Sequence, residues 1–165
     1  ADAPPEIDDA KLNRVVTYLR TLAPPAQRAP EAEKVIMGGK LFTRAGCAKC
    51  HTPTLKTGSH ASLDELKDQL IRPYTDLLLH DMGEALSDGI DKPGVSGREW
   101  RPPPLWGIGL TGTVNGNTFY LHDGRARTLE EAIMWHGGEG LSAKRAYADL
   151  ASKERDLLLQ FLQSL

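Results

Sequence analysis

Apolar residues recur at helical spacing in two well-separated parts of the chain. In residues 9–22, the apolar positions 12, 15, 16 and 19 share one helical face, and Pro24 and Pro25 end the helix. A similar pattern predicts a closing helix at residues 152–165. A further helix is predicted from about Pro30, at its first turn, to the cysteine-containing segment at residues 47–51, and its glycines Gly38 and Gly39 allow close approach of another helix. These segments indicate a mostly α-helical protein.

The middle of the chain, residues 52–128, has no sustained periodicity and is predicted to be loop and turn, with one short helix at residues 63–70. The prolines at positions 102–104 require extended backbone. After them, Thr128 and Glu131 form a capping box that predicts a helix running to Gly137. The expected fold is therefore a set of helices joined by long loops.

Residues 15–22 match residues 158–165 position by position in residue character, aromatic on aromatic and leucine on leucine. A helix that closes a domain at residue 165 therefore has a counterpart before residue 23. We interpret residues 1–29 as the tail of a preceding domain with a Pro-rich linker, and residues 30–165 as the main domain. The alternative is that two amphipathic helices are alike by chance.

Length, charge and composition narrow the functional classes. The chain has 165 residues and a formal net charge of -2 with both signs mixed along it, which favours neither nucleic acid nor an anionic membrane as partner. No apolar run reaches membrane-spanning length. The 16 glycines and 11 prolines fit long loops around a cofactor that supplies part of the core.

The sequence CAKCH at residues 47–51 is the signature of covalent c-type haem attachment. Cys47 and Cys50 can each bond one vinyl group of a porphyrin, and His51 is then held beneath the ring as an axial ligand of iron. A zinc site or a bare dithiol is the alternative, but zinc usually requires a second close pair of ligands. The sequence thus predicts one covalently attached haem c.

The second axial position decides between an electron carrier and an open, reactive haem. The candidate ligands are Met37, Met82, Met134, His60, His80, His122 and His136. In the helix after Thr128, His136 shares the apolar face of Leu129 and Ile133, whereas Met134 lies with the glutamates. We therefore predict His136 as the ligand, with Met82 as the runner-up.

Two His-Asp pairs and two arginines are further candidates for the pocket. The pairs begin at His80 and His122, where an aspartate can fix the tautomer of an imidazole. Arg125 and Arg127 can pair bidentately with haem propionates. No catalytic residue can be assigned from these patterns.

From Gly39 onward the chain resembles the C-terminal haem domain of the bacterial di-haem oxidoreductases. It is most similar to the branch labelled thiol oxidoreductases, and more distantly to di-haem cytochrome c peroxidases and MauG. The matching stretches are GCAKCH at 46–51, PYTDLLLHDMG at 73–83, EWRPPPLWG at 99–107, LHDGRARTLEEAI at 121–133 and WHGGE at 135–139. The resemblance implies a cytochrome c-like helical domain wrapped around its haem, and Trp106 within these stretches is a candidate cofactor contact.

The resemblance also places the second ligand at the position of His136, where the peroxidase relatives carry methionine. Two histidine ligands imply a lower reduction potential than histidine with methionine. The chain has one CxxCH where the family has two, so we expect a fragment or domain whose haem partner is absent. The expected function is electron transfer in the periplasm, to or from a redox partner protein or second haem domain. The alternative is a peroxidase-like enzyme with an open distal site and His80 or His122 as acid and base.

Overall fold

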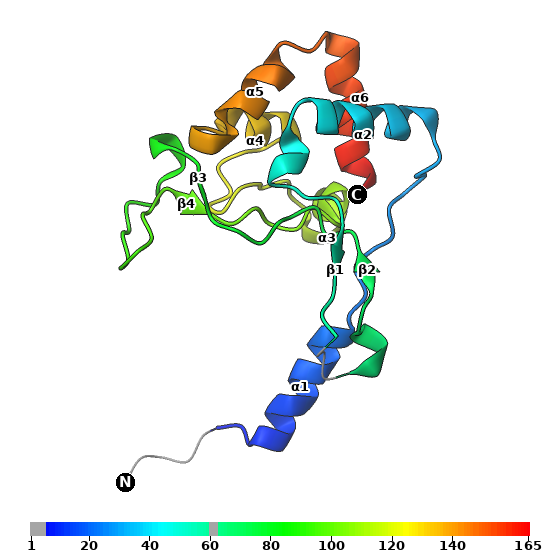
Figure 1. Cartoon of the computed structure of the whole chain (residues 1–165), viewed down its shortest axis with the longest axis vertical. Coiled ribbons are helices and arrows are strands. Elements are labelled where there is room, and N and C mark those ends of the chain that lie inside the picture. The colour runs from blue at the N-terminus through cyan, green and yellow to red at the C-terminus, as the bar shows by residue number, and fades with distance from the viewer. Residues whose placement is uncertain (1–5, 60–62) are drawn as a thin grey trace.

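The computed structural model describes residues 6–59 and 63–165, and the predicted candidate His60 lies outside the described residues. Its helices confirm the mostly α-helical fold. They are α1 (Asp9–Thr21), α2 (Glu33–Arg44), α3 (Thr111–Asn115), α4 (Leu129–Trp135), α5 (Leu141–Ala148) and α6 (Ser152–Ser164). All except α1 gather at one end of the molecule (Figure 1).

The core lies between α2 and α6, which cross at Gly38. A Cβ atom at Gly38 would lie 2.1 Å from the carbonyl oxygen of Leu157 and 2.6 Å from Cβ of Phe161, so only glycine allows this approach. Phe161 packs against Phe42, with ring centroids 5.3 Å apart, and against Tyr74 at 5.8 Å. The predicted role of glycine in α2, close approach of another helix, is confirmed. This packing fixes the end of α2, from which the CxxCH segment continues.

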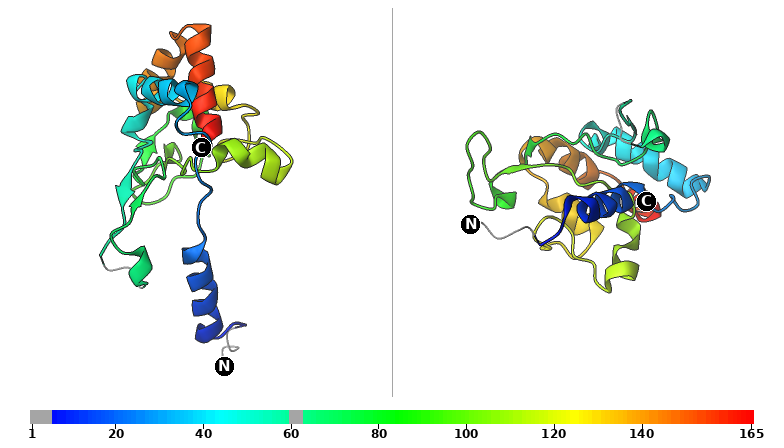
Figure 2. Two further views of the ribbon diagram at one scale, coloured as in Figure 1. Left: turned by 90° about the vertical axis from the view of Figure 1, so that its right-hand side faces the viewer. Right: turned by 90° about the horizontal axis from the view of Figure 1, so that it is seen from below.

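Helix α1 lies apart from this core. Asp8 caps its first turn by accepting a hydrogen bond from the amide of Lys11, and none of its residues is buried. It projects below the other helices, and the left view of Figure 2 separates it from the described part of the loop of residues 52–72, which overlaps it in Figure 1. The predicted helix at residues 9–22 is confirmed, but its apolar face has no partner among the described residues.

The middle of the chain is mostly loop, as predicted, with two small antiparallel sheets. Strand β1 (Leu55–Lys56) pairs with β2 (Leu70–Ile71), and β3 (His80–Asp81) pairs with β4 (Glu99–Trp100). The helix predicted at residues 63–70 is wrong: a single 3₁₀ turn at Asp64–Leu66 leads into β2, because pairing with β1 outweighs the weak local helical pattern.

Two helix boundaries also differ from the prediction. Helix α2 begins at Glu33 rather than Pro30, because the backbone at Ala32 is extended, with a ψ of 130°, and separates Pro30 from the helix. Helix α4 ends at Trp135, so His136 is its C-cap residue rather than an interior one. The segment from Arg101 to Leu105 has no regular secondary structure, as its prolines require.

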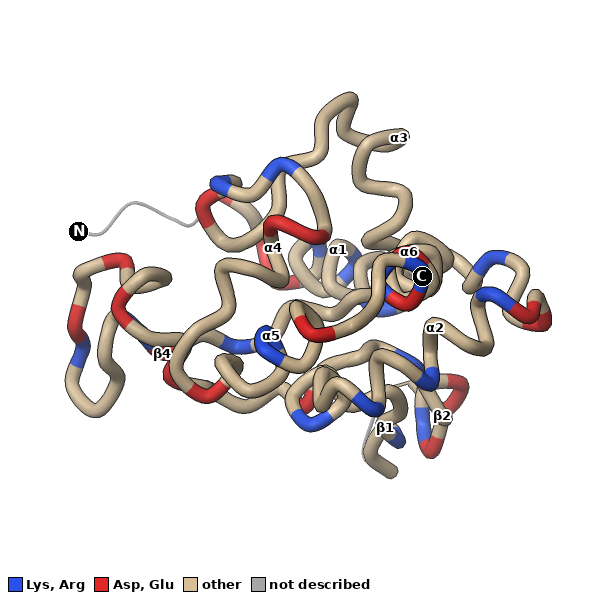
Figure 3. The backbone as a smooth tube through the Cα atoms, turned by 90° about the horizontal axis from the view of Figure 1, so that it is seen from above, with Lys and Arg blue, Asp and Glu red and all other residues tan. Residues whose placement is uncertain are grey.

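Charged residues of both signs are interspersed along much of the described backbone, whereas the segment around α3 carries none (Figure 3). No helix among the described residues is long and apolar enough to cross a membrane.

Candidate haem site

The CxxCH segment forms a tight turn directly after α2. Gly46 has a φ of 91°, a backbone conformation that favours glycine, and it ends the helix so that Cys47–Lys49 can form a 3₁₀ turn. The amide of His51 donates to the carbonyl of Cys47 at 3.0 Å. The turn brings both cysteines and His51 into one short segment, which is the arrangement that attachment to a porphyrin requires.

Burial acts on both cysteine thiols. It raises the pKa of Cys47 to about 11, and burial together with the charges of Asp76 and Glu139 raises the pKa of Cys50. Both cysteines are free thiols. They are therefore neutral at physiological pH and not activated in the way that a redox dithiol is.

The ring of His51 is oriented by the backbone of Tyr74. Its Nδ1 lies 3.0 Å from the Tyr74 carbonyl oxygen and donates to it, which leaves Nε2 as the atom with a free lone pair. Burial lowers the pKa of His51 to about 4, so the imidazole is neutral at physiological pH. A neutral imidazole with one nitrogen held by a carbonyl is the form that ligates a metal.

His136, the C-cap residue of α4, is also oriented by a hydrogen bond between its Nδ1 and a backbone carbonyl. Thr128 caps α4 by accepting from the amide of Glu131, and Glu131 accepts from the amide of Arg127 rather than from Thr128 itself. At the other end of α4, Nδ1 of His136 donates to the carbonyl of Ala132 at 2.8 Å. Burial lowers the pKa of His136. Its side chain turns inward while Met134 is 41% exposed, as the helical face predicted.

The imidazoles of His51 and His136, both partly buried, lie close to each other. Their ring centroids are 6.5 Å apart and their planes differ by 49°. Metal–imidazole nitrogen bonds are about 2 Å long, so two imidazoles that bind one ion from opposite sides have centroids roughly 6 Å apart. No hydrogen bond within the described ranges reaches Nε2 of His51 or of His136. The donor set thus fits a metal held between the two rings.

The other predicted ligands lie elsewhere or beside this pair. A Cβ atom at Gly140 would lie 3.1 Å from Cε of Met82 and 3.2 Å from Cδ2 of His136, so Met82 ends beside the His136 ring. Met37 is 41% exposed. His122 stacks on Trp100, with ring centroids 3.6 Å apart. Of the described candidates, His136 is the one whose ring faces that of His51.

His80 is bound by two carboxylates that sequence analysis did not identify. Its Nε2 lies 2.8 Å from Oδ2 of Asp76, and its Nδ1 lies 2.8 Å from Oε2 of Glu139. The expected partner, Asp81, instead pairs with Arg98 at 3.2 Å. The spacing of Asp76 and His80, four residues apart, was the one available signal in the sequence; Glu139 gave none because it is distant along the chain.

The sulfur of Cys50 also lies near this cluster, 3.6 Å from Nδ1 of His80. Cys50, Asp76 and His80 are grouped closely enough, within 4.8 Å, to act as metal ligands. However, both ring nitrogens of His80 already face carboxylates, so the group is arranged as an ion pair beside a cysteine.

Arg125 and Arg127 lie in contacts of their own. Nε of Arg125 is 2.6 Å from Oδ2 of Asp123, and its guanidinium lies over the ring of Trp135 at 4.8 Å. The guanidinium of Arg127 lies over Phe119 at 4.2 Å. Their predicted pairing with haem propionates stays a prediction.

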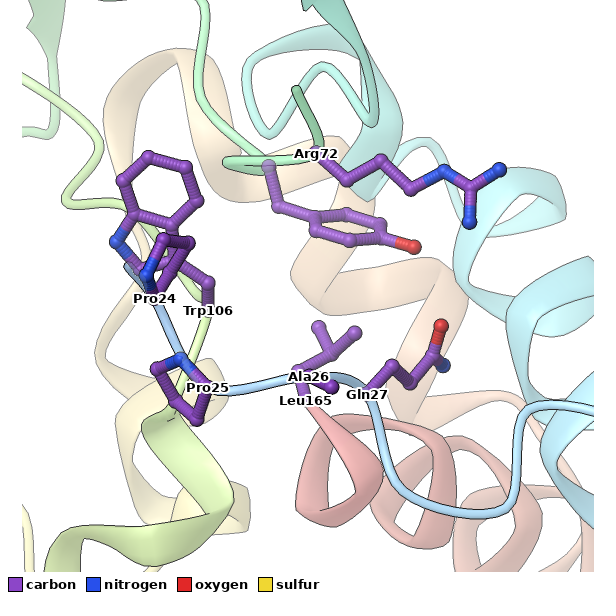
Figure 4. Close-up of a pocket in the computed structure, with 8 residues that line it drawn as sticks. Pro24, Pro25, Ala26, Gln27, Arg72, Trp106 and Leu165 are labelled. Atoms are coloured by element: carbon purple, nitrogen blue, oxygen red, sulfur yellow. The ribbon is translucent and has the colours of Figure 1, made fainter. Parts of the chain in front are cut away.

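Trp106 lines a pocket of ≈ 310 Å³ together with residues of the linker after α1. Figure 4 shows Trp106 with Pro24 and Pro25 on one side and with Arg72 and Gln27 on the other. Tyr74, whose carbonyl accepts from His51, also lines this pocket. The linker after α1 therefore lines the same pocket as Tyr74.

A comparison with known protein families matches the whole chain, residues 1–165, to the family described as "Di-haem oxidoreductase, putative peroxidase". No curated protein and no solved structure matches the chain.

Proposed function

The chain belongs to the di-haem oxidoreductase family, and on this basis we propose that residues 30–165 form a c-type cytochrome domain that carries single electrons in the periplasm. Cys47 and Cys50 would tether one haem c, and His51 and His136 would bind its iron. The observation that carries the proposal is the facing pair of imidazoles, each with Nδ1 held by a backbone carbonyl.

The residues around the site support electron transfer rather than bond chemistry. When bound, the haem supplies one-electron redox chemistry. The carbonyls of Tyr74 and Ala132 fix the tautomer of each imidazole and make Nε2 a better donor. With both imidazoles bound to it, the iron would have no open position for a substrate. Two imidazoles also give a lower reduction potential than imidazole with methionine.

The family name indicates two haems, and the chain has one CxxCH. We infer that residues 1–29 belong to a preceding domain that binds the other haem and exchanges electrons with this one. In support, α1 repeats the residue pattern of α6, yet its apolar side chains are exposed; they are Leu12, Val15, Tyr18, Leu19 and Leu22. The face that α6 buries against α2 is the face that α1 leaves free for a partner helix.

A second candidate function is peroxide reduction at this haem, which the words of the family description favour. It requires His136 to leave the distal position and His80 or His122 to act as acid and base. His80 is bound between two carboxylates and His122 is stacked on Trp100. In this arrangement neither imidazole is free to act as acid or base toward peroxide. Electron transfer is therefore the function that the geometry supports best.

The first test is intact mass after expression with the haem maturation machinery. The mass should exceed that of the polypeptide by one haem, and replacement of both Cys47 and Cys50 by alanine should abolish the difference. A protein that binds zinc and has the mass of the bare polypeptide would instead make the cluster of Cys50, Asp76 and His80 a metal site.

The second test is the optical and EPR spectrum of the ferric protein. Wild type should be low-spin and six-coordinate. His136→Ala should convert it to high-spin and make it reactive with peroxide, whereas the neighbouring control Met82→Leu should leave it low-spin. A low-spin His136→Ala with a high-spin Met82→Leu would transfer the ligand role to Met82, and a high-spin wild type would favour the peroxidase.

A further inference from the structure

Asp76, His80 and Glu139, which we call the His80 bridge, connect the two segments that hold the facing imidazoles. Asp76 is two residues after Tyr74, the residue that binds Nδ1 of His51. Its amide also donates to the carbonyl of Cys50 at 2.9 Å. Glu139 is three residues after His136, in the turn at Gly138–Gly140. His80 lies between them, with 2.8 Å to each carboxylate.

The turn after His136 is fitted closely to the strand that contains His80. Added Cβ atoms at Gly138 and Gly137 would lie 2.1 Å from the carbonyl oxygen of Asp81 and 2.8 Å from that of Met82. Oε1 of Glu139 accepts from the amide of Asp81 at 3.0 Å. Backbone contact and a side-chain hydrogen bond therefore hold the turn at Gly138–Gly140 against β3. A shift of β3 would consequently move the C-terminal end of α4.

The bridge is an ion pair that is protected from solvent at its centre. Each ring nitrogen of His80 faces a carboxylate oxygen, so both must carry a proton and the ring is an imidazolium. Burial opposes this charge, but the hydrogen bonds to Glu139 and Asp76 outweigh it and raise the pKa of His80. The side chains of His80 and Asp76 are only 13% and 14% exposed. Charge-assisted hydrogen bonds of this kind have a defined geometry.

We propose that the His80 bridge positions His136 relative to His51. The bridge, which lies beside Cys50, thereby sets the angle and spacing of the two imidazoles. His80 and Glu139 act as positioning residues and contact neither the substrate nor the metal. This inference rests on the proposed six-coordinate haem. The bridge acts through the backbone, because Asp76 is two residues from Tyr74 and Glu139 is three residues from His136. Groups outside the ligand set commonly change the properties of a metal site.

The experiment compares Glu139→Gln and His80→Gln with a matched control, Glu154→Gln. Glu154 also accepts from one backbone amide, that of Ala151, and from one cationic side chain, that of Arg44. Each of the three substitutions replaces the original side chain with the neutral amide of glutamine. The readouts are the EPR g-values of the ferric protein, which report the angle between axial ligand planes, and the rate at which carbon monoxide binds the ferrous protein, which requires release of His136.

We expect both bridge variants to stay low-spin with shifted g-values, and to bind carbon monoxide faster by roughly tenfold, the lower end of the effect of outer-shell substitutions on metal sites. Glu154→Gln should match wild type in both readouts. Glu139 is 55% exposed, so its variant should fold and load haem even if the His80 variant does not.

Unchanged g-values and carbon monoxide rates in Glu139→Gln, with a low-spin wild type, would overturn the bridge and leave the proposed function intact. Equal changes in Glu154→Gln would overturn it as well, because the effect would then be a general loss of rigidity. A high-spin wild type would overturn the proposed function and this inference together.

Discussion

Helices α1 and α6 carry matching residue patterns but have opposite environments. Leu158 and Phe161 of α6 are 0% and 5% exposed, whereas Val15 and Tyr18 at the matching positions of α1 are 47% and 64% exposed. Helix α6 meets the glycines of α2, and α1 meets no such helix among the described residues. An amphipathic pattern therefore specifies which face a helix can bury, while the partner decides whether that face is buried.

The largest test of this comparison exchanges the matching aromatic residues for alanine. Phe161→Ala should lower the free energy of unfolding by about 3–5 kcal/mol, because it leaves a cavity between α2, α6 and Tyr74. Tyr18→Ala should change it by less than about 0.5 kcal/mol, as expected for an exposed position. Denaturant unfolding of the haem-loaded chain gives both values. A comparable loss in Tyr18→Ala would mean that α1 is packed in solution, for example against a second copy.

A smaller effect is expected from the two adjacent glycines of α2. Gly38→Ala should cost about 1–3 kcal/mol, because its Cβ atom would force α2 and α6 apart. Gly39→Ala should instead stabilise by roughly 0.5 kcal/mol, since its Cβ atom would lie 3.4 Å from the Phe161 ring, an ordinary contact, and alanine favours the helix. Thermal unfolding monitored by circular dichroism measures both. Equal losses in the two variants would contradict the crossing at Gly38.

The smallest effect is expected from the ion pair that joins α2 and α6 at the surface. Arg44 and Glu154 lie 2.6 Å apart, with side chains 62% and 35% exposed. Glu154→Gln should destabilise the protein less than either Phe161→Ala or Gly38→Ala, and the difference from wild type should shrink as salt is added. A large loss that persists at high salt would show that the helix contact depends on this pair rather than on apolar packing.

Local features of the fold could be predicted from the sequence, and the candidate site could be predicted in part. The helices at α1 and α6 and the cap at Thr128 depend on residues within a few positions of one another, so their pattern can be recognised. The inward direction of His136 followed from helical geometry for the same reason. The short segment at residues 63–70 was predicted wrongly, because its strand forms only by pairing with β1.

The chemical partners of the predicted residues could not be deduced in this way. His80 was expected to use the aspartate next to it, but Asp76 and Glu139 bind it instead. Glu139 is 59 residues away, and no short-range pattern connects the two. The role of Tyr74 was equally hidden, because its contribution is a backbone carbonyl that any residue would supply.

The sequence by itself determined the longer helices α1, α2 and α6 to within a few residues, the CxxCH segment and the face on which His136 lies, because each depends on spacing within a few turns of backbone. Only the tertiary structure decided which of two similar helices is buried, that the ring of His136 faces His51, and which carboxylates bind His80. These contacts join residues brought together by the path of the whole chain, and that path depends on the packing of α2 against α6 and on the loops between them.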